Sequence, residues 1–191
     1  EGIVDIENTQ GISDGFETLT IVSQGEEANL MNDIEATDNN LLDVKIDAQQ
    51  ALETGTITFS SEDDEAEAMF TVDGNSEVTV TSLDAYYGDI DTLNVVNNLT
   101  DGAYLEVTGY DDYPAIDADV ESLSFSGEGD ILLGNEDNSF AGVDGWYNLS
   151  LIDASELSGN FLLGDVDAID SEDFTFMSGT GETFMLLGDD I

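Results

Sequence analysis

The feature that most constrains this chain is its charge: 45 Asp and Glu residues stand against a single cation, Lys45, with no His and no Cys. A formal net charge of −44 on 191 residues opposes a compact fold, because like charges at that density repel one another. We therefore expect the folded protein to take its neutralising cations from solution.

The same composition excludes several classes of partner and chemistry. Nucleic acids, anionic lipid surfaces and phosphate-bearing substrates need Lys or Arg, and one lysine cannot form a basic patch. Without Cys or His, the chain can build neither thiolate or imidazole metal sites nor a Ser/His/Asp triad. The remaining oxygen ligands suit hard cations such as Ca²⁺.

The acidity does not predict disorder or a membrane protein. Disordered acidic chains are poor in apolar residues, whereas 40% of this sequence is hydrophobic. No apolar run approaches the roughly 18 residues that a membrane-spanning helix needs. We expect a folded protein that does not insert into a membrane.

Most apolar residues lie in short alternating runs bounded by Gly, Asn, Asp and Ser, which is typical of half-buried strands. The central apolar residues of five such runs are spaced 25, 49, 30 and 26 positions apart, and the gap of 49 indicates a missing middle strand near Phe70–Val72 or Val78–Val80. The five central residues are Leu19, Val44, Leu93, Leu123 and Leu149. A repeat of this length predicts a solenoid.

Shorter apolar runs lie between these strands, and three of them end at Gly134, Gly164 or Gly188. Glycine after a short strand supplies the positive φ of a tight corner. The sequence therefore predicts an all-β fold, a parallel β-solenoid (β-roll or β-helix) with short strands and Gly/Asp turns. We expect one continuous segment, residues 1–191, within a larger protein.

Alternation also predicts which side chains face the interior of the solenoid. The pairs expected there are Leu19/Ile21, Leu93/Val95, Leu123/Phe125 and Leu149/Leu151. Helix should be scarce, and the two segments that could form short helices are Gly25–Asp33 and Ser61–Met69.

Acidic turns that contain glycine are the candidate metal sites. In Ser126–Asp130, glycines would let carbonyl oxygens turn inward while Glu128 and Asp130 supply charge. A solvated acidic turn without metal is the alternative for any one of them. The other candidate ligands are Glu136, Asp137, Asp111, Asp112, Asp117, Asp119, Asp165, Asp167, Asp170 and Asp173.

Three segments resemble repeat units of bacterial surface-layer and adhesin proteins of the repeats-in-toxin group. They are Phe16–Asn29, Leu41–Leu52 and Leu149–Gly159. The resemblance implies an exported β-roll or β-helix that binds Ca²⁺ in Gly/Asp turns. The signature nonapeptide of that group appears only in shortened forms, at 127–131, 134–137 and 179–182, so we expect scattered Ca²⁺ sites.

Together these observations predict a non-enzymatic, Ca²⁺-stabilised structural segment of an extracellular surface protein: a surface layer, filament or adhesin. It should assemble with copies of itself or with neighbouring segments. One alternative is a salt-adapted acidic surface or viral decoration protein without specific metal. A less favoured alternative is a β-helix glycosidase with paired carboxylates. Glycan contact is a further option, through Tyr86, Tyr87, Tyr110, Tyr113, Trp146 and Tyr147.

Overall fold

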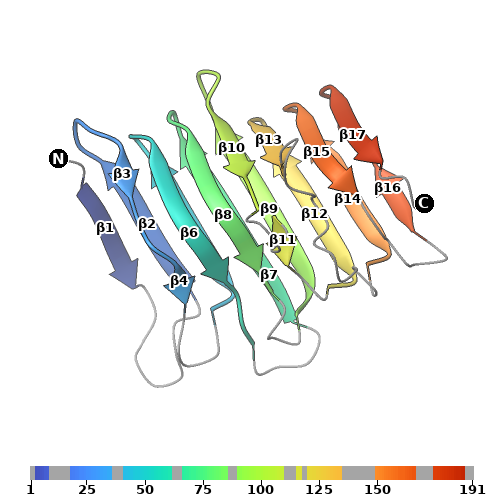
Figure 1. The fold of residues 1–191 in the computed structure, drawn as a ribbon, viewed down its shortest axis with the longest axis horizontal. Helices are drawn as coiled ribbons and strands as arrows, with labels where there is room; N and C mark the ends of the chain where they lie inside the picture. The colour runs from blue at the N-terminus through green and yellow to red at the C-terminus, as the bar shows by residue number, and fades with distance from the viewer. Residues whose placement is uncertain are drawn as a thin grey trace.

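The structure is a computed structural model, and it forms a parallel β-solenoid in which two sheets face each other across an apolar core (Figure 1). No helix occurs among the residues that it describes. Those residues are 3–8, 18–35, 41–61, 66–85, 90–109, 115–117, 120–134, 149–166 and 174–187. The prediction of an all-β parallel solenoid is therefore confirmed.

Each solenoid turn places one strand in sheet A and the next in sheet B, through a short connection that we call an arch. Sheet A has the order β1 (Ile3–Asn8), β2 (Thr18–Gln24), β5 (Asp43–Ala48), β7 (Ala66–Gly74), β9 (Ile90–Leu99), β12 (Ser122–Gly127), β14 (Leu151–Leu157) and β16 (Thr175–Met177). Sheet B has the order β17 (Thr183–Leu187), β15 (Phe161–Val166), β13 (Asp130–Leu133), β10 (Tyr104–Val107), β8 (Val78–Asp84), β6 (Leu52–Thr58) and β3 (Asn29–Leu30). Two short strands complete sheet B: β11 (Ile116–Asp117) pairs with β8, and β4 (Ile34–Glu35) pairs with β6.

The strand pairs are parallel with one exception, β1, which runs antiparallel to β2. Parallel in-register stacking places residues of successive turns directly above one another. One such row is Leu19, Val44, Phe70, Val95 and Phe125. Its members are buried because every second side chain of a strand points between the sheets.

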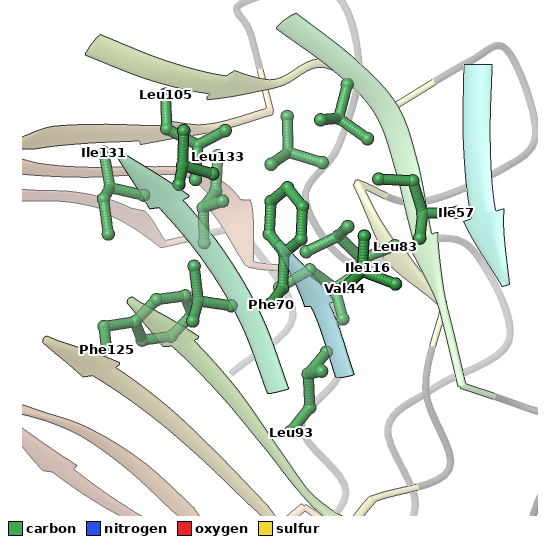
Figure 2. Close-up of a cluster of buried hydrophobic side chains, with 14 of the residues drawn as sticks. Val44, Ile57, Phe70, Leu83, Leu93, Leu105, Ile116, Phe125, Ile131 and Leu133 are labelled. Atoms are coloured by element: carbon green, nitrogen blue, oxygen red, sulfur yellow. The ribbon is translucent and has the colours of Figure 1, made fainter. Parts of the chain in front are cut away.

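The core is continuous along the solenoid and consists of side chains from both sheets. In Figure 2, Phe70 and Leu93 of sheet A lie across from Leu83 and Leu105 of sheet B, and each is fully buried. Near the C-terminal end, the Phe161 ring lies 4.9 Å from that of Phe125 and 6.3 Å from that of Phe176. Full burial of one such side chain contributes about 1.5–3 kcal/mol, which favours folding against the repulsion between surface acids.

The structure confirms part of the predicted interior and corrects the rest. Leu19/Ile21, Leu93/Val95 and Leu123/Phe125 are buried, and the missing middle strand of sheet A is Phe70–Val72, within β7. Of the fourth pair, Leu149 is buried as predicted, whereas Leu151 faces outward, and Ile152 and Ala154 take interior positions of β14. Ser150 and Leu151 both donate their backbone N–H to the carbonyl oxygen of Glu121, and this irregular step shifts the alternation by one residue.

Neither segment considered for a short helix is helical where the structure describes it. Gly25–Asp33 contains an arch and the strand β3, because buried Asn29 donates its side-chain amide to the Ser23 hydroxyl and the Gln24 carbonyl. In Ser61–Met69, residues 66–69 belong to β7 and pair with β9. Pairing within the sheet overrides the weak local preference for helix at both places.

Candidate metal site

The candidate turn Ser126–Asp130 is the arch that joins β12 to β13. Gly127 has φ +108°, a left-handed conformation that favours glycine. A Cβ on Gly129 would lie 2.6 Å from Nδ2 of Asn97, near the end of β9 in the preceding turn. Both glycines are therefore needed, one for the corner and one for the close approach of the arch to β9.

Asn97 holds this arch in place from inside the solenoid. Its side chain is fully buried, its Nδ2 donates to the carbonyl oxygen of Asp130 at 2.7 Å, and its Oδ1 accepts from the Leu99 N–H at 3.1 Å. The Asn97 carbonyl oxygen accepts from the Gly129 N–H at 2.9 Å. Asn97 is thus a positioning residue that sequence reasoning missed, although an amide at an inward position of an apolar strand was a usable signal.

The Asp130 carboxylate takes part in a chain of hydrogen bonds that runs from turn to turn. Its Oδ1 accepts from the Asn160 N–H at 2.7 Å, and its Oδ2 accepts from Asn160 Nδ2 at 3.2 Å. Asn160 Oδ1 in turn accepts from the Glu182 N–H at 3.0 Å. We call Asp130, Asn160 and Glu182 the polar ladder, and its bonds fasten the starts of β13, β15 and β17 to one another.

The described part of this arch supplies two carboxylates, those of exposed Glu128 and of Asp130. Ca²⁺ takes six to eight oxygen ligands, so these two residues do not complete a site by themselves. Across the described residues, no group of three or more acidic side chains is arranged to hold a metal ion. The Ca²⁺ site at this arch stays a prediction.

The other predicted ligands fall mainly outside the described residues. Asp117 belongs to β11, in register with Asp84 of β8, and Asp165 belongs to β15. Sequence reasoning missed Asp84, because only the pairing within sheet B brings it beside Asp117. The predicted ligands outside the described residues are Asp111, Asp112, Asp119, Glu136, Asp137, Asp167, Asp170 and Asp173. The six aromatic residues considered for glycan contact also lie outside them.

The strands that precede these acidic segments lie side by side in sheet B. Val107 of β10, Leu133 of β13 and Leu163 of β15 occupy one row, at which β10 and β13 end and beyond which β15 continues to Val166. The segments that carry the predicted ligands therefore begin at the C-terminal ends of neighbouring strands, on successive turns. This arrangement follows from the parallel topology and cannot be read from residue spacing alone.

A second acidic cluster surrounds Lys45 on the outer face of sheet A. The Lys45 Nζ lies 2.6 Å from the Asp73 carboxylate, and Asp47 is directly in register with Asp73. Asp73 also accepts from Asn98 Nδ2 at 2.9 Å. A cation is thus placed where parallel stacking sets two aspartates side by side.

The pKa values of this cluster reflect its shared cation. Partial burial raises the pKa of Asp43, and the charge of Lys45 offsets part of that rise. Burial alone would also raise the pKa of Asp73, but hydrogen bonds from Lys45 and Asn98 and the Lys45 charge lower it overall. The hydrogen bond to Asp73, followed by the charges of Asp73, Asp47 and Asp43, raises the pKa of Lys45.

Comparison with known proteins adds no family. No protein-family model, curated protein or solved structure matches this chain. The described residues also include no helix that is long and apolar enough to cross a membrane.

Proposed function

We propose that this chain is a non-enzymatic structural segment of an extracellular surface protein, a surface layer, filament or adhesin, whose fold Ca²⁺ stabilises. The observation that carries the proposal is the stacking of acids in register. Asp47 lies in register with Asp73, on neighbouring strands of sheet A. Like charges on neighbouring strands destabilise a sheet, and the chain has one lysine to relieve them.

The parallel topology supports a role for divalent ions. The segments that hold most of the predicted ligands follow β10, β13 and β15, at the same end of these neighbouring strands of sheet B. Segments that are distant in sequence therefore start on successive turns of the solenoid. The sequence resemblance to repeats-in-toxin surface proteins agrees with this role and with export from the cell. A long solenoid with a continuous core suits a structural segment, because each turn contacts only its neighbours and the length can grow by repetition.

The mechanism would be linkage between binding and folding. At free Ca²⁺ about tenfold above the dissociation constant, one site that exists only in the folded state adds roughly 1.4 kcal/mol. Several sites of the weak extracellular type would then rival the marginal stability of a domain. The protein would remain poorly folded at low Ca²⁺ and fold where millimolar Ca²⁺ is present.

The test is calorimetric melting of the purified chain at low ionic strength, with chelator and with millimolar Ca²⁺. We expect Ca²⁺ to raise the melting temperature, and sodium at the same millimolar concentration to leave it nearly unchanged. The salt-adapted alternative predicts that sodium at high concentration replaces Ca²⁺ fully by screening. An unchanged melting temperature in chelator, or equal protection by millimolar sodium, would falsify the Ca²⁺ proposal.

A matched pair of variants separates lost ligands from lost repulsion. Asp111→Asn with Asp112→Asn removes two adjacent predicted ligands. Glu26→Gln with Glu27→Gln removes two adjacent exposed acids of an arch that is not a predicted site. Both doubles reduce the net charge equally, so we expect only the first to reduce the Ca²⁺-induced shift in melting temperature. Equal shifts in the two doubles would show that 111 and 112 are not ligands.

A further inference from the structure

The arch that joins β9 to β10, in the middle of the solenoid, contains a tight turn at Asp101 and Gly102. The Ala103 N–H donates to the carbonyl oxygen of Thr100 at 3.1 Å. The two residues between them have φ of +60° and +80°, and positive φ at both central positions identifies a type I′ turn. Among the residues that the structure describes, Asp101 is the one residue other than glycine with a positive φ.

The tip of this turn is uncovered. Asp101 and Gly102 are both exposed, and a Cβ built on Gly102 would meet no atom within 4 Å. Within the described part of the chain, no hydrogen bond or ion pair holds the Asp101 carboxylate. The side chain of Asp101 and the peptide group that follows it are therefore free to rotate.

An aspartate followed by glycine can react with its own main chain. The Gly102 nitrogen attacks Cγ of the protonated Asp101 carboxyl group, the carboxyl C–OH bond breaks, and the hydroxyl group leaves with the amide proton as water. Water then opens the five-membered succinimide at either carbonyl, which gives aspartate or isoaspartate. Glycine favours the attack because it has no Cβ to cover its nitrogen. The sequence has four Asp-Gly dipeptides, and the structure describes those that begin at Asp73 and Asp101.

The positive φ of Asp101 brings it close to the reactive conformation. Ring closure requires the Gly102 nitrogen to turn towards the Asp101 side chain. In a type II′ turn the first central residue keeps φ near +60° and has ψ of about −120°, which gives the nitrogen this orientation. Only the peptide plane between the two residues must rotate, and Gly102 accepts the resulting negative φ as readily as its present one.

The same dipeptide at Asp73 and Gly74 provides an internal comparison, because there the structure opposes the reaction. The Asp73 carboxylate is paired with Lys45. The Gly74 carbonyl oxygen accepts from both the N–H and the hydroxyl of Thr100, and a Cβ on Gly74 would collide with the carbonyl oxygen of Ala48. This peptide plane cannot rotate unless neighbouring turns separate.

We propose that Asp101 is a modification site, at which the folded protein slowly converts its own aspartate to isoaspartate through a succinimide formed with Gly102. The reaction needs no enzyme and no partner other than water. The product keeps one carboxylate, so the net charge of the chain is unchanged, but its main chain is one methylene longer between β9 and β10. This inference depends on neither Ca²⁺ binding nor location outside the cell.

The test is to store the folded chain at neutral pH, below its melting temperature, and to follow the two dipeptides with time. Cleavage after glutamate yields peptides 68–77 and 78–106, which contain one Asp-Gly dipeptide each. Electron-transfer dissociation distinguishes aspartyl from isoaspartyl peptides. We expect isoaspartate to form at Asp101 about tenfold faster than at Asp73 or more, because Asp73 must wait for local opening. Equal rates, or a faster reaction at Asp73, would overturn the proposal.

The unfolded chain and two folded media provide the controls. In urea the two dipeptides should react at similar rates, because the difference between them comes from the fold. The folded chain is stored in millimolar Ca²⁺ and again in concentrated sodium chloride, and circular dichroism confirms its β structure. Isoaspartate at Asp101 in both media supports this inference even if the melting data exclude Ca²⁺. Its absence from a chain that Ca²⁺ stabilises would overturn this inference alone.

Two variants test the mechanism at the turn. Gly102→Asn, a residue that tolerates positive φ, covers the attacking nitrogen with a Cβ and should slow the reaction at Asp101 several-fold. Asp101→Asn loses ammonia instead of water in the same step, so it should deamidate faster than the wild type isomerises, with a change of intact mass. Circular dichroism confirms that each variant is folded. An unchanged rate in Gly102→Asn, or a stable amide in Asp101→Asn, contradicts attack by the Gly102 nitrogen.

Discussion

Lys45 illustrates at the scale of a residue how this chain manages its charge. Its ammonium group contacts Asp73, and the charges of Asp43 and Asp47 also act on it. The Lys45 side chain is 45% exposed, so water screens these attractions and the ion pair contributes roughly 0.2–1 kcal/mol to folding. The position of Lys45 next to two aspartates in register reduces the repulsion between them, although the ion pair itself is weak.

We predict that Lys45→Met, which keeps most of the aliphatic stem, destabilises the protein at pH 7 by up to about 1 kcal/mol at low salt. Because the folded-state pKa of Asp73 is lowered from 3.8, the stability from the pair is present above that value and is lost as the pH falls through the folded pKa. Because the pKa of Lys45 is raised from 10.5, the same stability is lost as the pH rises through the folded pKa of the lysine.

Asp43 contributes with the opposite sign. Its pKa is raised in the folded protein, so the folded state binds its proton more readily and this group favours folding as the pH falls. Urea unfolding of the wild type and Lys45→Met between acid and neutral pH measures the difference. Adding Asp47→Asn to Lys45→Met should restore part of the loss. A variant as stable as the wild type at pH 7 and low salt would show that the cluster needs no cation.

Asn97 shows the other residue-scale rule, that a buried polar group must be paired. Its amide nitrogen and oxygen are both hydrogen-bonded, to backbone groups of its own turn and of the next. A buried amide without those partners would cost about 1–3 kcal/mol. Asn97 therefore fixes the register of one arch on the next, which apolar packing alone would leave free to slide.

At the scale of elements, the arches stack so closely that some positions tolerate only glycine. A Cβ on Gly159 would collide with the carbonyl oxygen of Gly129, and one on Gly181 would collide with that of Gly159. Gly102 is different, because a Cβ there would meet nothing within 4 Å, although its φ is +80°. Steric stacking and backbone conformation are thus separate reasons for glycine in these arches.

We predict that Gly159→Ala destabilises the protein by about 3 kcal/mol, because backbone atoms of two arches must move apart. Gly102→Ala should cost about 1 kcal/mol, through backbone strain alone. Thermal melting of both variants under one buffer condition tests the pair. Similar losses in the two variants would mean that the arches can separate without cost.

At the scale of the whole molecule, the solenoid is a row of turns, and each turn is stabilised mainly by its two neighbours. Each strand pairs only within its sheet, with the strands of the preceding and following turns. Local opening is therefore easiest at the ends, where a turn has one neighbour, and hardest in the middle. Stability along the chain should follow position in the stack.

We predict a gradient of amide hydrogen exchange along the solenoid. The amides of β7, β8 and β9 should exchange slowest, and those of β16 and β17, which have one paired neighbour each among the described strands, should exchange fastest. Uniform exchange across the turns would show that the molecule opens as one cooperative unit.

The sequence by itself determined the class of fold and the character of the surface. Alternation of apolar and polar residues fixed which face of a strand is buried, so the interior positions of Leu19, Leu93 and Leu123 followed from pattern alone. The pattern left two places for the missing middle strand, and only the pairing in sheet A chose Phe70–Val72 over Val78–Val80. The composition likewise fixed that acids would crowd the surface. These properties are local, because each depends on the identity of a residue and its near neighbours.

Only the tertiary structure decided which residues lie beside one another. Leu93 stacks on Ala68 instead of aligning with Leu19, and the irregular step before β14 turns Leu151 outward. The sequence pattern also did not predict the antiparallel β1, the contacts of Asn97 or the polar ladder. Alternation repeats every two residues, so a strand can slide by two and keep the same face inward. Hydrogen bonds between turns choose among those registers, and they join residues that lie more than twenty positions apart.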